Sequence, residues 1–101
     1  MKFQTEQRKV CFKEREIPYT FVSANMEDGV FDPTKLMFYP LIDFDKGVVI
    51  AGNIPLSATA ALVHFYHFCA WIGIHDPEFG VVVVSSYTIY LKVGDLLPIA
   101  I

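Results

Sequence analysis

The sequence predicts one small α/β domain in which a mixed sheet carries one main helix. Residues 47–52 form a short apolar run between two glycines, residues 56–69 are helix formers, and residues 71–76 again favour a strand. A β-α-β unit of this kind almost always has a right-handed crossover between parallel strands. With 101 residues, the chain has the size of one domain, and we expect residues 1–101 to form it.

The flanking segments supply the remaining strands. Residues 19–23 are β-branched and aromatic, which favours a strand, and residues 2–13 are compatible with a short one. Residues 76–80 have turn chemistry, and residues 81–86 are typical of a buried strand that pairs with residues 71–76. Shorter predicted features are a turn over residues 25–29, a helical turn from Asp32 and Pro33 to Leu36, and a small terminal element over residues 93–97.

Composition and charge limit the possible partners. Apolar residues make up 53% of the chain, more than so small a core needs, so we expect homo-oligomers. The net charge of −3 argues against binding duplex DNA, which relies on many Lys and Arg contacts to phosphate. Half of the eight basic residues lie between Arg8 and Arg15, and residues 47–91 contain none. A small nucleotide remains possible as a ligand.

The cysteines and the hydropathy pattern indicate the compartment. Cys11 and Cys69 have neither metal-ligand nor disulfide-framework spacing, so we expect reduced, buried thiols. No apolar stretch reaches the roughly 20 residues of a membrane span, and no signal region opens the chain. We therefore expect a cytoplasmic protein that does not bind membranes.

The predicted helix carries a histidine pair. At about 100° per residue, Ala60, His64 and His67 fall within a narrow arc, with Ser57 beside it. Two imidazoles one turn apart can share a metal ion or flank a phosphate. A pair with this spacing also has a purely structural interpretation, and both stay open.

A second group is expected where the parallel strands end. Ligands gather outside the carboxyl ends of such strands, which predicts that Asp76 and the loop of Gly52 and Asn53 share one edge of the sheet. The helix runs away from this edge, so His67 need not reach Asp76 within one subunit, and a site shared between subunits would solve that problem. Alternatively, Asp76 before Pro77 is a common turn opener and Gly52 simple turn punctuation.

Taken together, the order and spacing of several motifs resemble a small family of CRISPR-associated proteins from type III antiviral defence systems. The resemblance implies a minimal version of the CRISPR-associated Rossmann fold. It also implies a manganese-dependent ring nuclease that opens cyclic tetra-adenylate, or a 3′–5′ RNA exonuclease that acts as a deadenylase. The motifs are Gly47-Val-Val-Ile-Ala-Gly52, Pro55-Leu56, His64-Phe65-Tyr66-His67, Asp76-Pro77, Gly80-Val-Val-Val-Val-Ser and Val93-Gly-Asp95.

The resemblance also implies residue roles and partners. His67 and Asp76 would be catalytic, and His64, His67 and Asp76 would bind Mn²⁺. Cyclic tetra-adenylate or short oligoadenylate RNA would be the substrate. The protein would form a homodimer or a dimer of dimers, in which one dimer holds the nucleotide and another supplies the catalytic groups. The implied ligand-binding residues are Gly52, Asn53, Ser57, His64, Glu78 and Tyr87.

The chain departs from the family pattern where a group could touch an anion or a base. The family usually has arginine at the positions of Asn53 and Glu78, tryptophan at Ser57, and histidine at Phe68 and Tyr87. Two hypotheses follow: a metal-assisted phosphodiesterase, and a catalytically weak or inactive nucleotide-binding or assembly module of the same fold. A structural oligomer that binds no nucleotide is the third interpretation.

Overall fold

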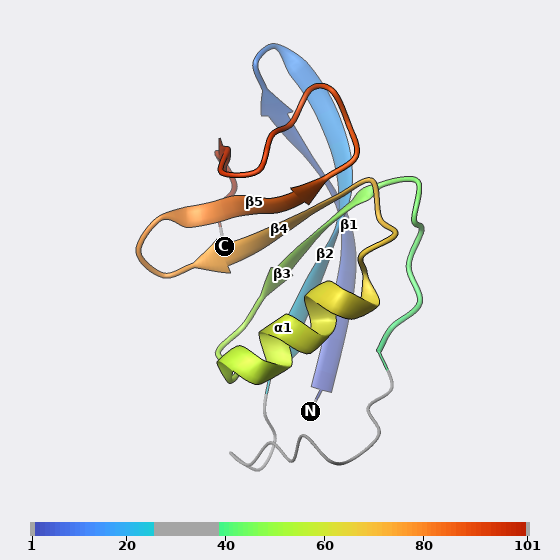
Figure 1. The fold of residues 1–101 in the computed structure, drawn as a ribbon, viewed down its shortest axis with the longest axis vertical. Coiled ribbons are helices and arrows are strands. Elements are labelled where there is room, and N and C mark those ends of the chain that lie inside the picture. The colour runs from blue at the N-terminus through green and yellow to red at the C-terminus, as the bar shows by residue number, and fades with distance from the viewer. Residues whose placement is uncertain (1, 26–38, 101) are drawn as a thin grey trace.

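The computed structural model describes residues 2–25 and 39–100, which form a six-stranded mixed sheet with one helix across a face (Figure 1). The predicted fold class is confirmed. The helix within these residues is not long and apolar enough to cross a membrane. The elements are β1 (Lys2–Phe12), β2 (Arg15–Asn25), β3 (Gly47–Ala51), α1 (Leu56–Phe65), β4 (Trp71–Asp76), β5 (Gly80–Ser86) and β6 (Leu96–Leu97).

The order of the strands in the sheet follows the chain from β1 to β6. β2, β3 and β4 are parallel, so β3, α1 and β4 form the predicted β-α-β unit. The predicted hairpin of β4 and β5 is antiparallel, and its register shifts between Ile72 and Gly73. β6, also antiparallel to β5, is shorter than the terminal element expected over residues 93–97.

The N-terminal strands are longer than the sequence predicted. β1 and β2 pair along their full lengths, and the loop between them is only Lys13 and Glu14, with φ of 51° and 64°. Two positive φ values define the tight hairpin turn that asparagine and glycine usually occupy. Two charged residues occupy it here, so the turn could not be recognised from its residue types. The helical turn expected from Asp32 to Leu36 lies outside the described residues.

The helix is shorter than predicted, since α1 ends at Phe65 and not near Cys69. Tyr66 follows it, fully buried, and its hydroxyl donates a hydrogen bond of 2.7 Å to the carbonyl oxygen of Pro40. Burial raises the pKa of this hydroxyl, which keeps it a neutral donor. The backbone then turns, with the Cys69 N–H donating to the Tyr66 carbonyl. His67 therefore lies in a turn after the helix.

Both faces of the sheet are apolar. Burial raises the pKa of the Cys69 thiol, under α1, to about 11, so the thiol stays protonated at neutral pH. Cys11 is exposed, which corrects the expectation that both thiols are buried. The core on the α1 side contains Val22, Ala24, Val48, Ile50, Leu62, Tyr66, Cys69 and Ile72. The core on the opposite side contains Val10, Ile17, Tyr19, Phe21, Val49, Ala51, Trp71, Val81, Val83, Leu91 and Leu97.

Gly47 leaves the space that the fully buried Trp71 ring occupies, because a Cβ at position 47 would lie 1.9 Å from Trp71 Cε2. We expect Gly47→Ala to lower the free energy of unfolding by about 1–3 kcal/mol through overpacking. The smaller ring of Trp71→Phe should relieve the clash, so the double variant should lose less stability than the two single losses combined. Urea unfolding of all four proteins measures this coupling, and additive losses would contradict it.

Candidate functional site

One group of candidate residues surrounds the edge where β2, β3 and β4 end. Ile50 pairs with Ile74, and this register, extended by two residues, places Gly52 level with Asp76. The predicted proximity of Asp76 to the loop after β3 is confirmed. α1 begins beside the same edge, on the left in Figure 1. We call this set the rim group: Gly52, Asn53, Ser57, Asp76 and Glu78.

Asp76 shapes the turn between β4 and β5. Its Oδ1 accepts hydrogen bonds from the backbone N–H groups of Glu78, at 2.8 Å, and Phe79, at 3.1 Å. This is the turn-opening role that its position before Pro77 indicated. Both contacts use one carboxylate oxygen, and the Glu78 side chain is exposed beside the turn. The rim is therefore negatively charged.

Backbone conformation and packing both require glycine at position 52. Its φ is +134°, and a Cβ there would lie 1.9 Å from the carbonyl oxygen of Ala24 at the end of β2. Only glycine fits this approach. Asn53 and Ser57 are exposed on either side of Pro55. The Pro55 carbonyl oxygen accepts hydrogen bonds from the third and fourth N–H groups of α1. Ser57 does not cap the helix with its side chain.

The remaining candidates lie at the opposite end of the sheet, and we call them the far-end group: His64, His67 and Tyr87. The rings of His64 and His67 stack with centroids 5.6 Å apart and planes 18° from parallel. The Tyr87 N–H donates to the carbonyl oxygen of Ala70 at 2.9 Å, which holds the start of the segment after β5 close to this pair. The two imidazoles are adjacent, as predicted, although His67 is outside the helix.

His67 has a fixed ring orientation. Its Nδ1 lies 2.7 Å from the carbonyl oxygen of His64. A carbonyl oxygen can only accept a hydrogen bond, so Nδ1 carries the proton. In the neutral ring, the Nε2 lone pair is then available as a proton acceptor or a metal ligand. The contact uses the backbone of His64, so the His64 side chain is not needed for it.

The proposed metal ligands do not meet within one chain. α1 has ten residues and a length of about 15 Å, and it separates the rim group from the far-end group. Among the described residues, no group of three His, Cys, Asp or Glu side chains is placed to hold a metal ion. His64 and His67 are together, but Asp76 is at the other end of the sheet. His64, His67 and Asp76 of one chain therefore do not form a three-ligand manganese site.

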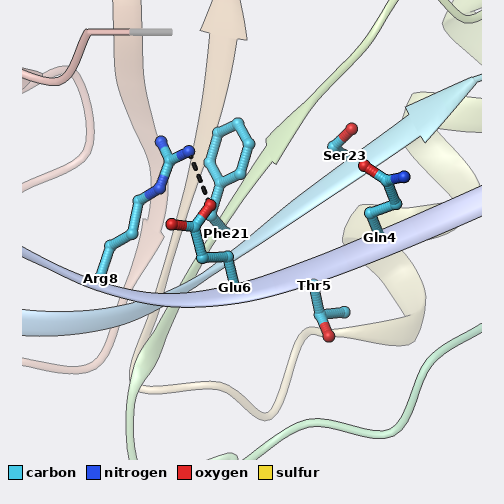
Figure 2. Close-up of a pocket in the computed structure, with 6 residues that line it drawn as sticks. All are labelled: Gln4, Thr5, Glu6, Arg8, Phe21 and Ser23. Atoms are coloured by element: carbon cyan, nitrogen blue, oxygen red, sulfur yellow. Dashed lines mark hydrogen bonds and ion pairs between the residues drawn. The ribbon is translucent and has the colours of Figure 1, made fainter.

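Two surface features were not predicted from the sequence. Exposed aromatic rings adjoin the far-end group: Phe68 lies 3.8 Å from the His67 ring and 6.4 Å from Phe44, measured between centroids. An open groove of about 500 Å³ also follows the N-terminal hairpin. The groove lies across β1 and β2, so it could be inferred only once the long hairpin was known. Its lining residues are Gln4, Thr5, Glu6, Arg8, Phe21 and Ser23 (Figure 2).

These observations define a small α/β protein with a mixed sheet and chemically distinct groups at the two ends of one crossover helix. The chain belongs to the family described as CRISPR-associated protein (Cas_csx3), which matches residues 25–98, about three quarters of the chain. This confirms the CRISPR-associated family that the motifs resemble. β1 and all of β2 except Asn25 precede the matched segment.

A curated relative has a matching sequence but no described activity. It is an uncharacterized protein from Aquifex aeolicus (strain VF5), 43% identical over 51 residues, which are 50% of this chain and 46% of the relative. The match thus spans about half the length of the relative.

Two substitutions of Asp76 separate its role as a hydrogen-bond acceptor in the turn from the role of its charge. We expect Asp76→Asn to keep the acceptor at Oδ1 and to unfold at nearly the wild-type temperature. Asp76→Ala leaves two backbone N–H groups without this acceptor and should cost about 1–2 kcal/mol. Thermal unfolding followed by circular dichroism measures both. Equal losses in the two variants would show that the carboxylate charge, not the acceptor geometry, holds the turn.

Proposed function

We propose that this protein is a cytoplasmic phosphodiesterase of type III CRISPR antiviral signalling that opens cyclic tetra-adenylate or shortens short oligoadenylate. The observation that carries the proposal is the His67 imidazole, held by the His64 carbonyl oxygen with Nε2 available. Membership of the CRISPR-associated family supports the biological setting. The proposal extends the resemblance to the ring-nuclease family, including its dependence on Mn²⁺.

His67 suits the proton transfers of phosphodiester cleavage. When a hydroxyl attacks the phosphorus atom, Nε2 of the neutral imidazole takes the hydroxyl proton, and the bond from phosphorus to the leaving ribose oxygen breaks. The imidazolium can then return the proton to that oxygen. An imidazole is effective in both steps because one ring nitrogen can accept a proton and return it.

The rim group and the far-end group come together when subunits assemble. In the proposed arrangement, the far-end group of one subunit adjoins the rim group of another, so His67 and Asp76 act on the same phosphodiester. A homodimer or dimer of dimers would provide this arrangement. We assign Mn²⁺ no place in the proton transfers, because its proposed ligands do not form a set within one chain.

A second function, nucleotide binding or assembly without cleavage, is favoured by the charges. Residues 47–91 contain no Lys or Arg, and Glu78 is exposed on the rim, where it repels phosphate. Asn53 and Tyr87 similarly lack the cationic groups of the family pattern. A chain with these substitutions can retain the fold and the oligomer while losing turnover.

The main test is cleavage of cyclic tetra-adenylate by the purified protein with Mn²⁺. We expect linear products, and none after chelation. His67→Ala should lower the rate on the order of a hundredfold, because it removes the general acid and base. His64→Ala should cost less, since the backbone carbonyl that orients His67 remains. His75→Gln is the matched control, because His75 faces away from α1, and it should cleave at the wild-type rate.

A second prediction separates the two functions if the wild type is inert. Asn53→Arg, Glu78→Arg and Tyr87→His, combined in one variant, add positive or protonatable groups near the proposed phosphate positions. Cleavage by this variant alone would identify the wild type as a binding or assembly module. If neither protein cleaves while both have folded circular dichroism spectra, the phosphodiesterase proposal is wrong. Calorimetry with cyclic tetra-adenylate then tests whether binding remains.

A further inference from the structure

β1 is a long edge strand. Its eleven residues pair with β2 on one side, and no other strand in the described part of the chain pairs with its outer edge. Such an edge presents a row of backbone N–H and C=O groups to any strand that can align with it. The chemistry of β1 therefore determines which strand that is.

The hairpin turn fixes which residues of β1 direct their backbone N–H and C=O groups away from β2. Phe12 and Arg15 flank the two-residue loop, and a turn of this type joins them by a backbone hydrogen bond. Hydrogen-bonded and non-hydrogen-bonded pairs alternate along an antiparallel ladder. Even-numbered residues of β1 thus face β2 with their backbone groups, whereas those of residues 3, 5, 7, 9 and 11 face outward. Two outward-facing residues must oppose each other in any antiparallel pairing at this edge.

The sequence of β1 is complementary to itself in one such register. If two copies pair along the whole strand, residue 2 opposes residue 12 and Gln7 opposes Gln7 on the two-fold axis. Glu6 then opposes Arg8 of the partner subunit, and this occurs twice by symmetry. These are non-hydrogen-bonded pairs, in which side chains lie closest.

The neighbouring registers are unfavourable. Moving the two-fold axis by one residue in one direction places Glu6 opposite Glu6, and in the other direction Arg8 opposite Arg8. Like charges that directly oppose each other destabilise a strand pair. The register that aligns all eleven residues is thus also the one that pairs opposite charges.

The two charges are already arranged on one face of β1. Arg8 Nη2 lies 2.9 Å from Glu6 Oε2, and the guanidinium carbon lies 4.0 Å from the centre of the Phe21 ring (Figure 2). Both side chains retain exposure, 31% for Arg8 and 62% for Glu6. Each side chain can therefore contact an opposite charge on a second subunit and keep its contact within its own chain.

We infer that two copies of this chain associate through antiparallel pairing of β1 with β1, centred on Gln7, so that their sheets become continuous. The occupant of this edge is a second copy because its own β1 supplies the opposing charges in the register that aligns all eleven residues. This inference locates a dimer interface in the hairpin that precedes the family-matched segment. It does not rest on the proposed nuclease activity, and either can fail alone.

Charge exchange tests the interface. Glu6→Arg and Arg8→Glu each place like charges opposite one another in the homodimer. The dissociation constant of each variant dimer should therefore be at least about tenfold higher than that of the wild type. An equimolar mixture of the two variants restores opposite charges across the edge although neither chain keeps its internal pair. Sedimentation equilibrium should therefore show heterodimers in the mixture. A monomeric wild type, unaltered dimerisation of the variants, or a mixture that stays monomeric would overturn the inference.

A cysteine crosslink tests the register independently if a charge variant fails to fold. In a Cys11→Ser background, Gln7→Cys places two thiols at a Cα separation of about 5.5 Å across the axis, within disulfide range. Thr5→Cys is the matched control on the same outer edge, and its two copies would lie four residues apart, about 14 Å. Oxidation should link only the first variant into a covalent dimer. Equal linking of both, or linking of neither, would contradict the proposed register.

Discussion

The crossover from β3 through α1 to β4 is the constraint on which the arrangement of this protein depends. Because β3 and β4 are parallel, the helix must return the chain to the starting end of the sheet. A helix that does so cannot place residues from its beginning and its end together. The rim residues and the imidazoles are therefore separated by the same connection that builds the core.

The packing of the sheet reinforces that separation. α1 and Tyr66 cover one face, while residues from the C-terminal segment, including Leu91 and Leu97, pack on the other. Fully buried β3 holds the centre. Chemistry in this fold must therefore occur at the ends of the strands or along the hairpin, where side chains remain exposed. The hairpin also differs in charge from the rest of the chain. Residues 2–25 have five basic and three acidic side chains, whereas the chain as a whole is acidic.

Much of this was predictable from short-range patterns, and the errors have identifiable physical causes. The apolar run of β3 and the turn at Asp76 follow from local sequence, and both were predicted. The end of α1 was not, because the hydrogen bond from Tyr66 to Pro40 joins residues far apart in the chain. The long hairpin was missed since Lys13 and Glu14 lack the usual turn chemistry. In the site, the proximity of the imidazoles was predicted, but the carbonyl contact that orients His67 depends on where the helix ends.

Hydrogen bonds of the Ala70 backbone restrain the end of the molecule that carries the imidazoles. The Ala70 N–H is shared between the carbonyl oxygens of Phe44 and Lys46, both at 3.1 Å, and its own carbonyl oxygen accepts the Tyr87 N–H. Three segments distant in sequence thus meet at one residue next to the imidazole pair. The opposite edge is built from an exposed loop and a tight turn. Ordering such a loop costs conformational entropy, whereas a junction tied from three sides has already lost it. A molecule that binds at the imidazole end therefore meets a backbone that is already held in place.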